Sequence, residues 1–273
     1  MAIMAANSEK SVIGKLSYLH PDSEPPEFHM GPPGTDTRRV GQHTPVAVEI
    51  LNARLLDEPP QLEGAGFTLI QHNTSDVNFD CSESIKADYY PQVETVFKQV
   101  TGAEKIIMFD HTVRVDSNIE GVQRPARHVH NDYTAASTVQ RVIDLVGGDE
   151  AVSRLRHRFI ELNLWRPIEH TVESSPLALA DARSIETDDL VKADIIYADR
   201  RGEVFEVVHR DTHRWYYYPN MTTDEALIIK GYDSSPHSKY RFTPHTAFDD
   251  PQSPLNPVPR KSIELRAMAF FNA

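Results

Sequence analysis

The sequence predicts an α+β protein in which helices precede a β-sandwich or barrel. Apolar residues recur at helical intervals in 82–102 and 137–158. From residue 158 onward the chain instead shows about eight short apolar runs separated by turn residues, a pattern typical of antiparallel sandwiches and barrels. We find no internal repeat. Helices first and strands after favour an α+β chain whose C-terminal half is a closed or layered sheet.

The first 44 residues differ from the rest in composition. They are rich in proline and glycine, as in "HPDSEPPEFHMGPPGTDTRR", and show no clear periodicity. We expect 1–44 to form an extended arm and 45–273 to form a single domain. Within that domain, "GFTLIQHNT" (66–74) is the first strand-like run.

A helix is predicted over 82–102, where apolar residues lie three or four positions apart. Ser84 is a candidate cap and Gly102 a stop, while Pro91 should bend the helix. "EKIIMFDHTVRV" then predicts a buried strand. "STVQRVIDLVGG" and "DEAVSRLRHR" indicate two short amphipathic helices.

The predicted strands of the second half each end at turn residues. They are "RFIELNLWRPI", "SPLALAD", "ADIIYAD", "EVFEVVHR", "HRWYYYP", "EALIIKGYD", "RFTPHTAF" and "SIELRAMAFF".

Composition excludes several functional classes. The net charge of −12 argues against a nucleic-acid partner. No apolar run is long enough to span a bilayer and the N-terminal apolar stretch is too short for a secretory signal, so we expect no membrane partner and a cytoplasmic location. The single cysteine, Cys81, excludes an internal disulfide framework and a thiolate zinc cluster.

The segment "HVHNDYT" (128–134) offers a candidate metal site. On a strand, residues two apart face the same way, so His130 and Asp132 can present two ligands from one short segment. Two histidines and one carboxylate form the facial set of mononuclear iron oxygenases. Two other interpretations compete: Asp132 or Thr134 caps the following helix, or the segment is a solvated polar turn.

A third ligand must come from farther along the chain. His245, in "RFTPHTAFDDP", is our first candidate and His213, in "HRWYYYP", is its rival. His128 has the same strand parity as His130 and is expected to pack beside it. The remaining histidines that we considered, His111, His209 and His237, are expected to be structural or exposed.

Cationic and hydroxyl side chains follow His245. Arg260 and Ser262 have strand spacing, so both can face one pocket and hold the distal carboxylate of a keto-diacid. Arg266 lies on the same face. Because a buried charge needs a partner, Arg266 should meet either that ligand or an acidic side chain. We favour Arg260 for the carboxylate.

With these stretches in view, the chain resembles the AsaB/CmcJ-like hydroxylase/desaturase family, which includes the fungal gibberellin desaturase. The matching stretches are "FDHTVR", "RPARHVHNDYTAAS", "LNLWRPI", "SPLALADARSI", "HRWYYYPNMTTDEALIIKGYDS", "RFTPHTAFDDP" and "RKSIELRAMAFF". The resemblance covers residues from about 45 to the C-terminus. It implies a double-stranded β-helix (jelly-roll, cupin-like) core and an iron(II)- and 2-oxoglutarate-dependent oxygenase that uses O2.

The resemblance also implies residue roles. His130, Asp132 and His245 would bind iron, and Arg260 or Arg266 would bind 2-oxoglutarate. The expected reaction is hydroxylation or desaturation of a small secondary metabolite. Two alternatives stay open: a cupin-like metal-dependent hydrolase or isomerase, and a non-catalytic β-barrel that binds a small molecule.

Overall fold

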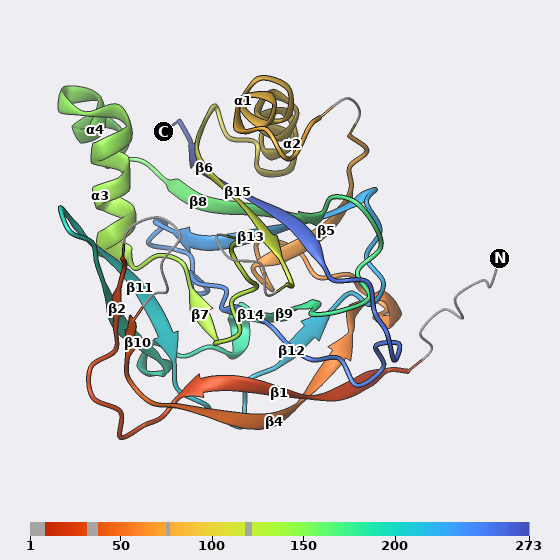
Figure 1. Cartoon of the computed structure of the whole chain (residues 1–273). Helices are drawn as coiled ribbons and strands as arrows, with labels where there is room; N and C mark the ends of the chain where they lie inside the picture. Colours follow the sequence, from red (N-terminus) through yellow and green to blue (C-terminus); the bar gives the residue numbers. More distant parts are fainter. Residues whose placement is uncertain (1–8, 32–37, 75–76, 118–121, 273) are drawn as a thin grey trace.

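Two β-sheets dominate the computed structural model, which describes residues 9–31, 38–74, 77–117 and 122–272 (Figure 1). The larger sheet has ten strands, in the order β1 (Ser11–Leu19), β4 (His43–Asn52), β12 (Trp215–Tyr217), β9 (Leu177–Ala180), β14 (His245–Ala247), β7 (His130–Asn131), β11 (Arg201–Val207), β10 (Leu190–Ile196), β2 (Glu27–His29) and β3 (Arg38–Val40). The smaller has five, in the order β5 (Phe67–Gln71), β13 (Glu225–Asp233), β8 (Phe159–Pro167), β15 (Lys261–Phe270) and β6 (Lys105–Val115).

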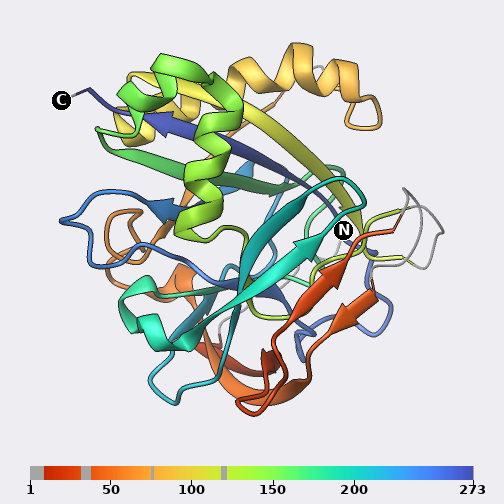
Figure 2. The same cartoon turned by 90° about the vertical axis from the view of Figure 1, so that its left-hand side faces the viewer.

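The helices lie outside the sheets (Figures 1 and 2). They are α1 (Ser82–Ser84), the π-helical turn η2 (Ile85–Tyr89), α2 (Tyr90–Thr101), α3 (Ala135–Val146) and α4 (Gly148–Arg154). Short 3-10 turns occur at η1 (Ala53–Leu55), η3 (Ala182–Ser184) and η4 (Thr187–Asp189). Both helical regions and all eight late strands predicted from the sequence are present. No helix of the described residues is both long and apolar enough to cross a membrane.

The N-terminal region departs from the expected arm. β1 pairs with β4 from Ser11 to Leu19, and β2 pairs with β10. Val12, Leu16 and Tyr18 are buried, so this run does have the two-residue period of a strand with one buried face. The prolines and glycines that follow the strand, from Pro21 onward, obscured that period. Residues 1–8 and 32–37 of the expected arm lie outside the described residues.

Two local expectations near the first helix were wrong. The helix begins at Ser82 after an uncapped Cys81, so Ser84 is not its cap. The strand β6 is an edge strand, and most of its residues are only half-buried. Gly102 does end α2, with a φ of 70°. Pro91 lies in the first turn of α2, directly after the π-helical turn. A proline has no N–H to donate, and its ring clashes with the carbonyl one turn earlier, so a regular α-helical turn does not continue through it.

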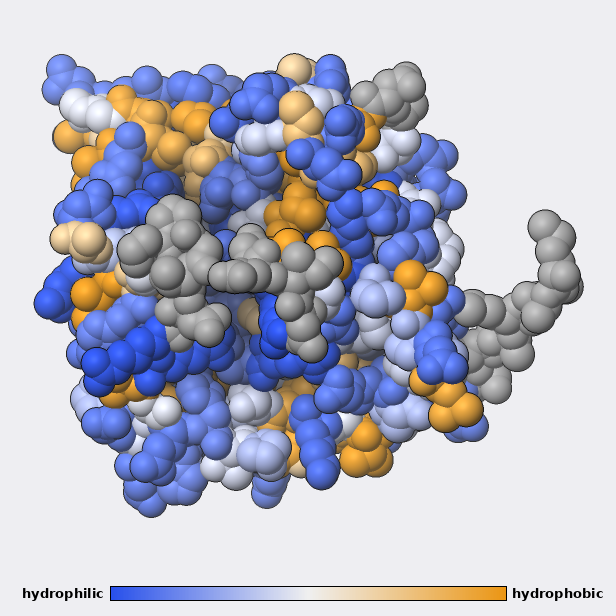
Figure 3. Space-filling model, in the orientation of Figure 1, coloured by the Kyte–Doolittle hydropathy of each residue, from blue (hydrophilic) through white to orange (hydrophobic). Residues whose placement is uncertain are grey.

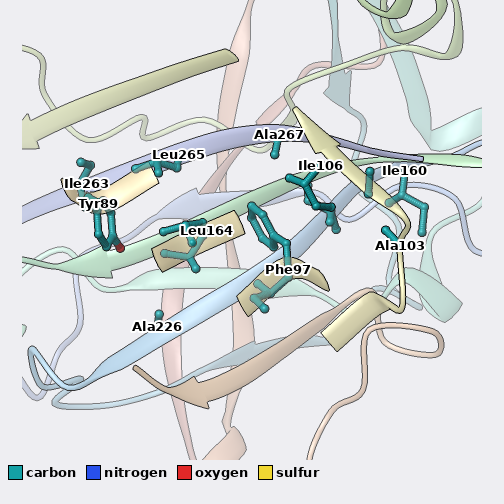
Figure 4. Packing of buried hydrophobic residues seen from close by; sticks show 14 of the residues in the cluster. Tyr89, Phe97, Ala103, Ile106, Ile160, Leu164, Ala226, Ile263, Leu265 and Ala267 are labelled. Atoms are coloured by element: carbon teal, nitrogen blue, oxygen red, sulfur yellow. The ribbon is translucent and has the colours of Figure 1, made fainter. Parts of the chain in front are cut away.

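Two layers of the apolar core pack against the five-stranded sheet and concern the site most directly. One lies between α2 and the outer face of the five-stranded sheet, where Phe97 and Tyr89 pack towards Leu164, Leu265 and Ile106 (Figure 4). The other lies between the two sheets, and its members are Phe67, Trp165, Leu177, Leu179, Tyr216, Leu227 and Ile229, with five further residues. The face of the molecule in Figure 3 is mostly hydrophilic. The side chains on the inner faces of the two sheets line the space between them.

Candidate metal centre

Three predicted ligands meet between the sheets. His130 lies on β7 and Asp132 directly follows it, while β14 pairs with β7 so that His245 is opposite His130. Their ligand atoms all lie within 4.8 Å of one another, and the two imidazole centroids are 4.8 Å apart. A first-row metal ion needs such atoms at about 2.0–2.2 Å, so small side-chain adjustments suffice. The donor set and its geometry fit a two-histidine, one-carboxylate centre.

Backbone carbonyls orient both imidazole rings. His130 Nδ1 lies 2.8 Å from the carbonyl oxygen of His128, and His245 Nδ1 lies 3.1 Å from that of Thr243. Because a carbonyl only accepts, each Nδ1 donates and each Nε2 keeps its lone pair. Metal-binding histidines are commonly fixed in this way. His130 Nε2 is 3.5 Å from Asp132 Oδ1, so the free lone pairs and this oxygen face one point.

Electrostatics keep the aspartate ionised. Burial alone would raise the pKa of Asp132, but the Arg266 charge and the His130 hydrogen bond hold it well below its usual range. Burial opposes the charged form of His130, but Asp132, the His128 carbonyl and Glu206 together raise that pKa. Burial, and then the charge of His130, lowers the pKa of His245. The carboxylate form of Asp132 and the neutral imidazoles of both histidines are the forms that would bind a cation, and a bound cation would displace any proton from His130 Nε2.

The second oxygen of Asp132 is held from the five-stranded sheet. Asn163 Nδ2 donates to Asp132 Oδ2 at 2.7 Å, and Arg266 Nε donates to the same atom at 3.2 Å. Sequence reasoning placed Asn163 and Trp165 on one face of a strand but did not connect Asn163 with the aspartate. Only the pairing of β8 with β15, which sets Asn163 opposite Arg266, brings the two donors together.

Acidic side chains surround Arg266. Besides Asp132, its guanidinium donates to Asp110 at 3.0 Å and to Glu264. Burial opposes the charge, but the carboxylates of Asp132 and Glu264 raise the pKa of Arg266 well above its usual value. The predicted alternative of an acidic partner is therefore the one realised. Each of the three guanidinium nitrogens of Arg266 thus already donates to a carboxylate.

Arg260 has the opposite character. It is 2% exposed, lies over the Trp165 ring at 5.2 Å, and donates to the Ser175 carbonyl. Its Nε and the Ser262 hydroxyl are both buried without a hydrogen-bond partner among the described residues. Burial, and then the nearby charge of Arg114, lowers the pKa of Arg260 to about 9. Unsatisfied buried donors of this kind are costly, and an anionic ligand would satisfy them.

Arg114 is a further cation that sequence reasoning missed. It pairs in register with Ser262 across β6 and β15, and its guanidinium donates to Gln123 and to the Arg124 carbonyl. Burial lowers its pKa. The signal was present in the alternation of "HTVRV", but only the strand pairing shows that Arg114 shares an end of the site with Arg260.

The other histidines considered from the sequence are not among the three candidate ligands. His128 packs on His130 with ring centroids 4.7 Å apart, as expected. His213, the rival ligand, instead contacts Asp189 at 3.0 Å and Tyr18 at 3.3 Å, so both of its ring nitrogens are engaged away from the centre.

The other three histidines considered from the sequence also take no part in the centre. His111 contacts the hydroxyls of Ser82 and Tyr90. His209 packs against Tyr18 with ring centroids 5.0 Å apart, and His237 is exposed.

The helix-cap interpretation holds for one residue of the segment. Thr134 is the N-cap of α3 and accepts a hydrogen bond from the Ser137 backbone N–H at 3.0 Å. Asp132 does not cap the helix. The same heptapeptide therefore starts a helix with its threonine and contributes to the centre with His130 and Asp132.

A cavity of about 1010 Å³ opens beside Asp132. Asp132 and Arg266 line it where it meets the centre, Arg114 lines it on β6, and Arg141 lines it on α3. Its opposite wall comes from β10 and β11. The volume suits a small organic molecule.

Comparison with known proteins agrees with this geometry. Residues 16–270 match the family model described as oxidoreductase/YMDC permease-like domain. The Fe(II)/2-oxoglutarate-dependent dioxygenase nvfI of Aspergillus novofumigatus is 30% identical, over 94% of this chain and 95% of its own. The alpha-ketoglutarate-dependent dioxygenase phiK of Fungal sp. (strain ATCC 74256) is 34% identical, over 77% and 79%.

A solved structure matches nearly the whole chain. The iron and alpha-ketoglutarate-dependent endoperoxidase NvfI superposes with a TM-score of 0.86 at 28% identity, covering 97% of this chain and 100% of its own. The hydroxylase/desaturase asaB of Aspergillus flavus is 33% identical over 53% of this chain and 70% of its own. The chain therefore belongs to the family of Fe(II)/2-oxoglutarate-dependent dioxygenases and hydroxylase/desaturases that contains these proteins.

Proposed function

We propose that this protein is an iron(II)- and 2-oxoglutarate-dependent oxygenase that hydroxylates or desaturates a small secondary metabolite. His130, Asp132 and His245 bind the iron, and the two sheets form the jelly-roll that carries them. The observation that supports this most directly is the convergence of two Nε2 atoms and one carboxylate oxygen on a single point beside a cavity. Three ligands on one face leave three positions for the co-substrate and O2.

Arg260 and Ser262 bind the distal carboxylate of 2-oxoglutarate. The unpartnered Nε of Arg260 and hydroxyl of Ser262 support this assignment, because a carboxylate would supply both missing acceptors. Trp165 packs on the guanidinium and fixes its plane. Arg266 is committed to Asp132 and its acidic neighbours, so it does not compete for the co-substrate.

The substrate occupies the cavity between α3, β10, β11 and β6. With iron, 2-oxoglutarate and O2 bound, the centre supplies an oxidant that removes hydrogen from a nearby carbon. The chain's own residues position that carbon beside Asp132 and exclude bulk water between the sheets. We further propose that the protein acts in the cytoplasm, without a nucleic-acid or membrane partner.

The test is spectroscopic and chemical. Iron(II) and 2-oxoglutarate, added anaerobically, should produce the weak visible charge-transfer band of a chelated keto acid. Admission of O2 should then release succinate. Replacement of His130 by alanine should abolish both signals. A wild-type protein that binds iron but gives neither the band nor succinate would favour a metal-dependent hydrolase or isomerase, and one that binds no metal would favour a binding barrel.

A further inference from the structure

We propose that Asn163 and Arg266 are positioning residues that restrict Asp132 to binding the metal through one oxygen, Oδ1. The inference rests on the proposed iron centre and concerns how the chain sets its coordination number. It assigns a role to two residues of the five-stranded sheet that contact no metal themselves.

The hydrogen bonds of the carboxylate divide it into two unlike oxygens. Oδ2 accepts from Asn163 Nδ2 at 2.7 Å and from Arg266 Nε at 3.2 Å. Oδ1 instead lies 3.5 Å from His130 Nε2, on the side where the three ligand atoms converge. An oxygen that already accepts two donors has both lone-pair directions occupied. The metal is therefore left with Oδ1.

Among the described residues, the side chain of Asn163 makes no hydrogen bond other than the one to Asp132. It lies on β8, near the middle of the five-stranded sheet, and its side chain is fully buried. Its amide nitrogen bonds Asp132, while its Oδ1 has no partner among the described residues. Turning the amide over would set two acceptor oxygens against each other. A buried amide oxygen without a partner costs free energy, so packing alone does not explain an asparagine at this position. Its hydrogen bond to the Asp132 carboxylate does.

Two acidic side chains fix the orientation of the Arg266 guanidinium. Its NH1 donates to Asp110 and its NH2 to Glu264, and these bonds direct Nε at Asp132. The bonds also offset part of the guanidinium charge, so the cation can lie beside a metal ligand without forming a bidentate pair with it. A bidentate pair would have used both carboxylate oxygens.

The consequence concerns the open positions of the centre. A carboxylate that chelates with both oxygens occupies two positions, and then only two are free in an octahedral complex. With one oxygen bound, three remain, enough for a bidentate keto acid and O2. The two donors thus preserve the vacancy on which the proposed reaction depends.

The test uses cobalt(II), which binds the same ligands without redox chemistry and whose d–d absorption reports coordination number. In the full-length protein, Asn163→Leu keeps the side-chain size and removes the donor. We expect its cobalt(II) affinity, measured by calorimetry, to fall about 10- to 100-fold, the range observed for outer-sphere partners of metal ligands. At saturating cobalt(II), the d–d spectrum should shift as the freed oxygen binds.

Arg266→Lys provides the second variant, because it keeps the charge while removing the fork that aims Nε. It should also weaken cobalt(II) binding and shift the spectrum, and it answers the question if Asn163→Leu fails to fold. Asn163→Ser, which keeps a donor, should restore part of the affinity.

The matched control is Glu161→Gln on the same face of the same strand. Glu161 is fully buried, its two carboxylate oxygens have no hydrogen-bond partner among the described residues, and glutamine keeps its shape. Its cobalt(II) affinity should match that of the wild type.

The outcomes separate the two proposals. Wild-type affinity and an unchanged spectrum in both Asn163→Leu and Arg266→Lys would overturn the positioning role alone. An equal loss in Glu161→Gln would also overturn it, by showing a general effect of disturbing the strand. A wild-type protein that binds no cobalt(II) would overturn the iron centre itself.

Discussion

Replacing Arg260 with methionine should greatly weaken 2-oxoglutarate binding while leaving metal affinity unchanged. Methionine keeps most of the length and apolar volume that packs on Trp165. What it removes is the guanidinium, whose NH1 already donates to the Ser175 carbonyl but whose Nε has no partner. About two charge-assisted hydrogen bonds to the carboxylate are lost, each contributing about 1.5–3 kcal/mol.

The sum, about 3–6 kcal/mol, corresponds to a loss of affinity of about 10²- to 10⁴-fold. It should be seen as a rise in the Michaelis constant for 2-oxoglutarate in a succinate-release assay, or as weaker binding to the cobalt(II) protein. The protein without co-substrate should lose no thermal stability. Burial lowers the pKa of Arg260 to about 9, so its charge is costly there until an anion binds.

Arg127→Met is the matched control, because it removes a neighbouring charge that is half-exposed and paired with Asp249. Its affinity for 2-oxoglutarate should change little, since exposed charges act weakly over distance. The assignment is reversed if Arg260→Met binds 2-oxoglutarate normally while Arg266→Met does not. If neither variant changes the affinity, 2-oxoglutarate is not the co-substrate.

Three further perturbations have defined outcomes. Asp132→Ala should abolish metal binding and succinate release while the melting temperature of the metal-free protein changes little, because Arg266 keeps its other acidic partners; failure to fold would contradict this. His213→Ala should cost about 1–3 kcal/mol of unfolding free energy, measured by urea titration, and leave cobalt(II) affinity intact. Glu225→Gln should cost about 1–3 kcal/mol at neutral pH because it disrupts the paired hydrogen bonds from Arg54. Burial raises the pKa of Glu225, but the Arg54 hydrogen bonds, the Thr222 backbone hydrogen bond and the Arg54 charge together lower it. The stabilisation should therefore be full above the ordinary carboxyl pKa and disappear as pH falls through the lowered one. A deficit that persists in acid would refute the last assignment.

The three candidate ligands that the structure brings together could be found in the sequence because their spacing carries information. His130 and Asp132 are two residues apart, and His245 lies in a run with strand character, so chemistry and strand geometry together narrowed the choice. The late strands were equally visible, because each is an apolar run bounded by turn residues. The strand β1 was missed, since the prolines and glycines that follow it, from Pro21 onward, outweighed its alternation of Val12, Leu16 and Tyr18.

Strand pairing contains the information that the sequence alone could not supply. Asn163 and Arg266 are more than a hundred residues apart, and nothing in either segment reports that β8 and β15 are neighbours. The same pairing distinguishes Arg260 from Arg266, which sequence patterns treat alike. The Arg266 guanidinium contacts three carboxylates, whereas that of Arg260 contacts none at hydrogen-bond distance among the described residues.

Asp132 also connects the two sheets. Its backbone follows β7 of the ten-stranded sheet, whereas the donors to its Oδ2 belong to β8 and β15 of the other sheet. Any change in the spacing of the sheets therefore moves the carboxylate relative to the two imidazoles. The thickness of the apolar layer around Trp165 and Leu227 thus becomes a determinant of coordination chemistry. Evolutionary drift in those side chains should be restrained by the tolerance of the metal as well as by stability, and alternative side chains there should be accepted mainly when their combined volume is conserved.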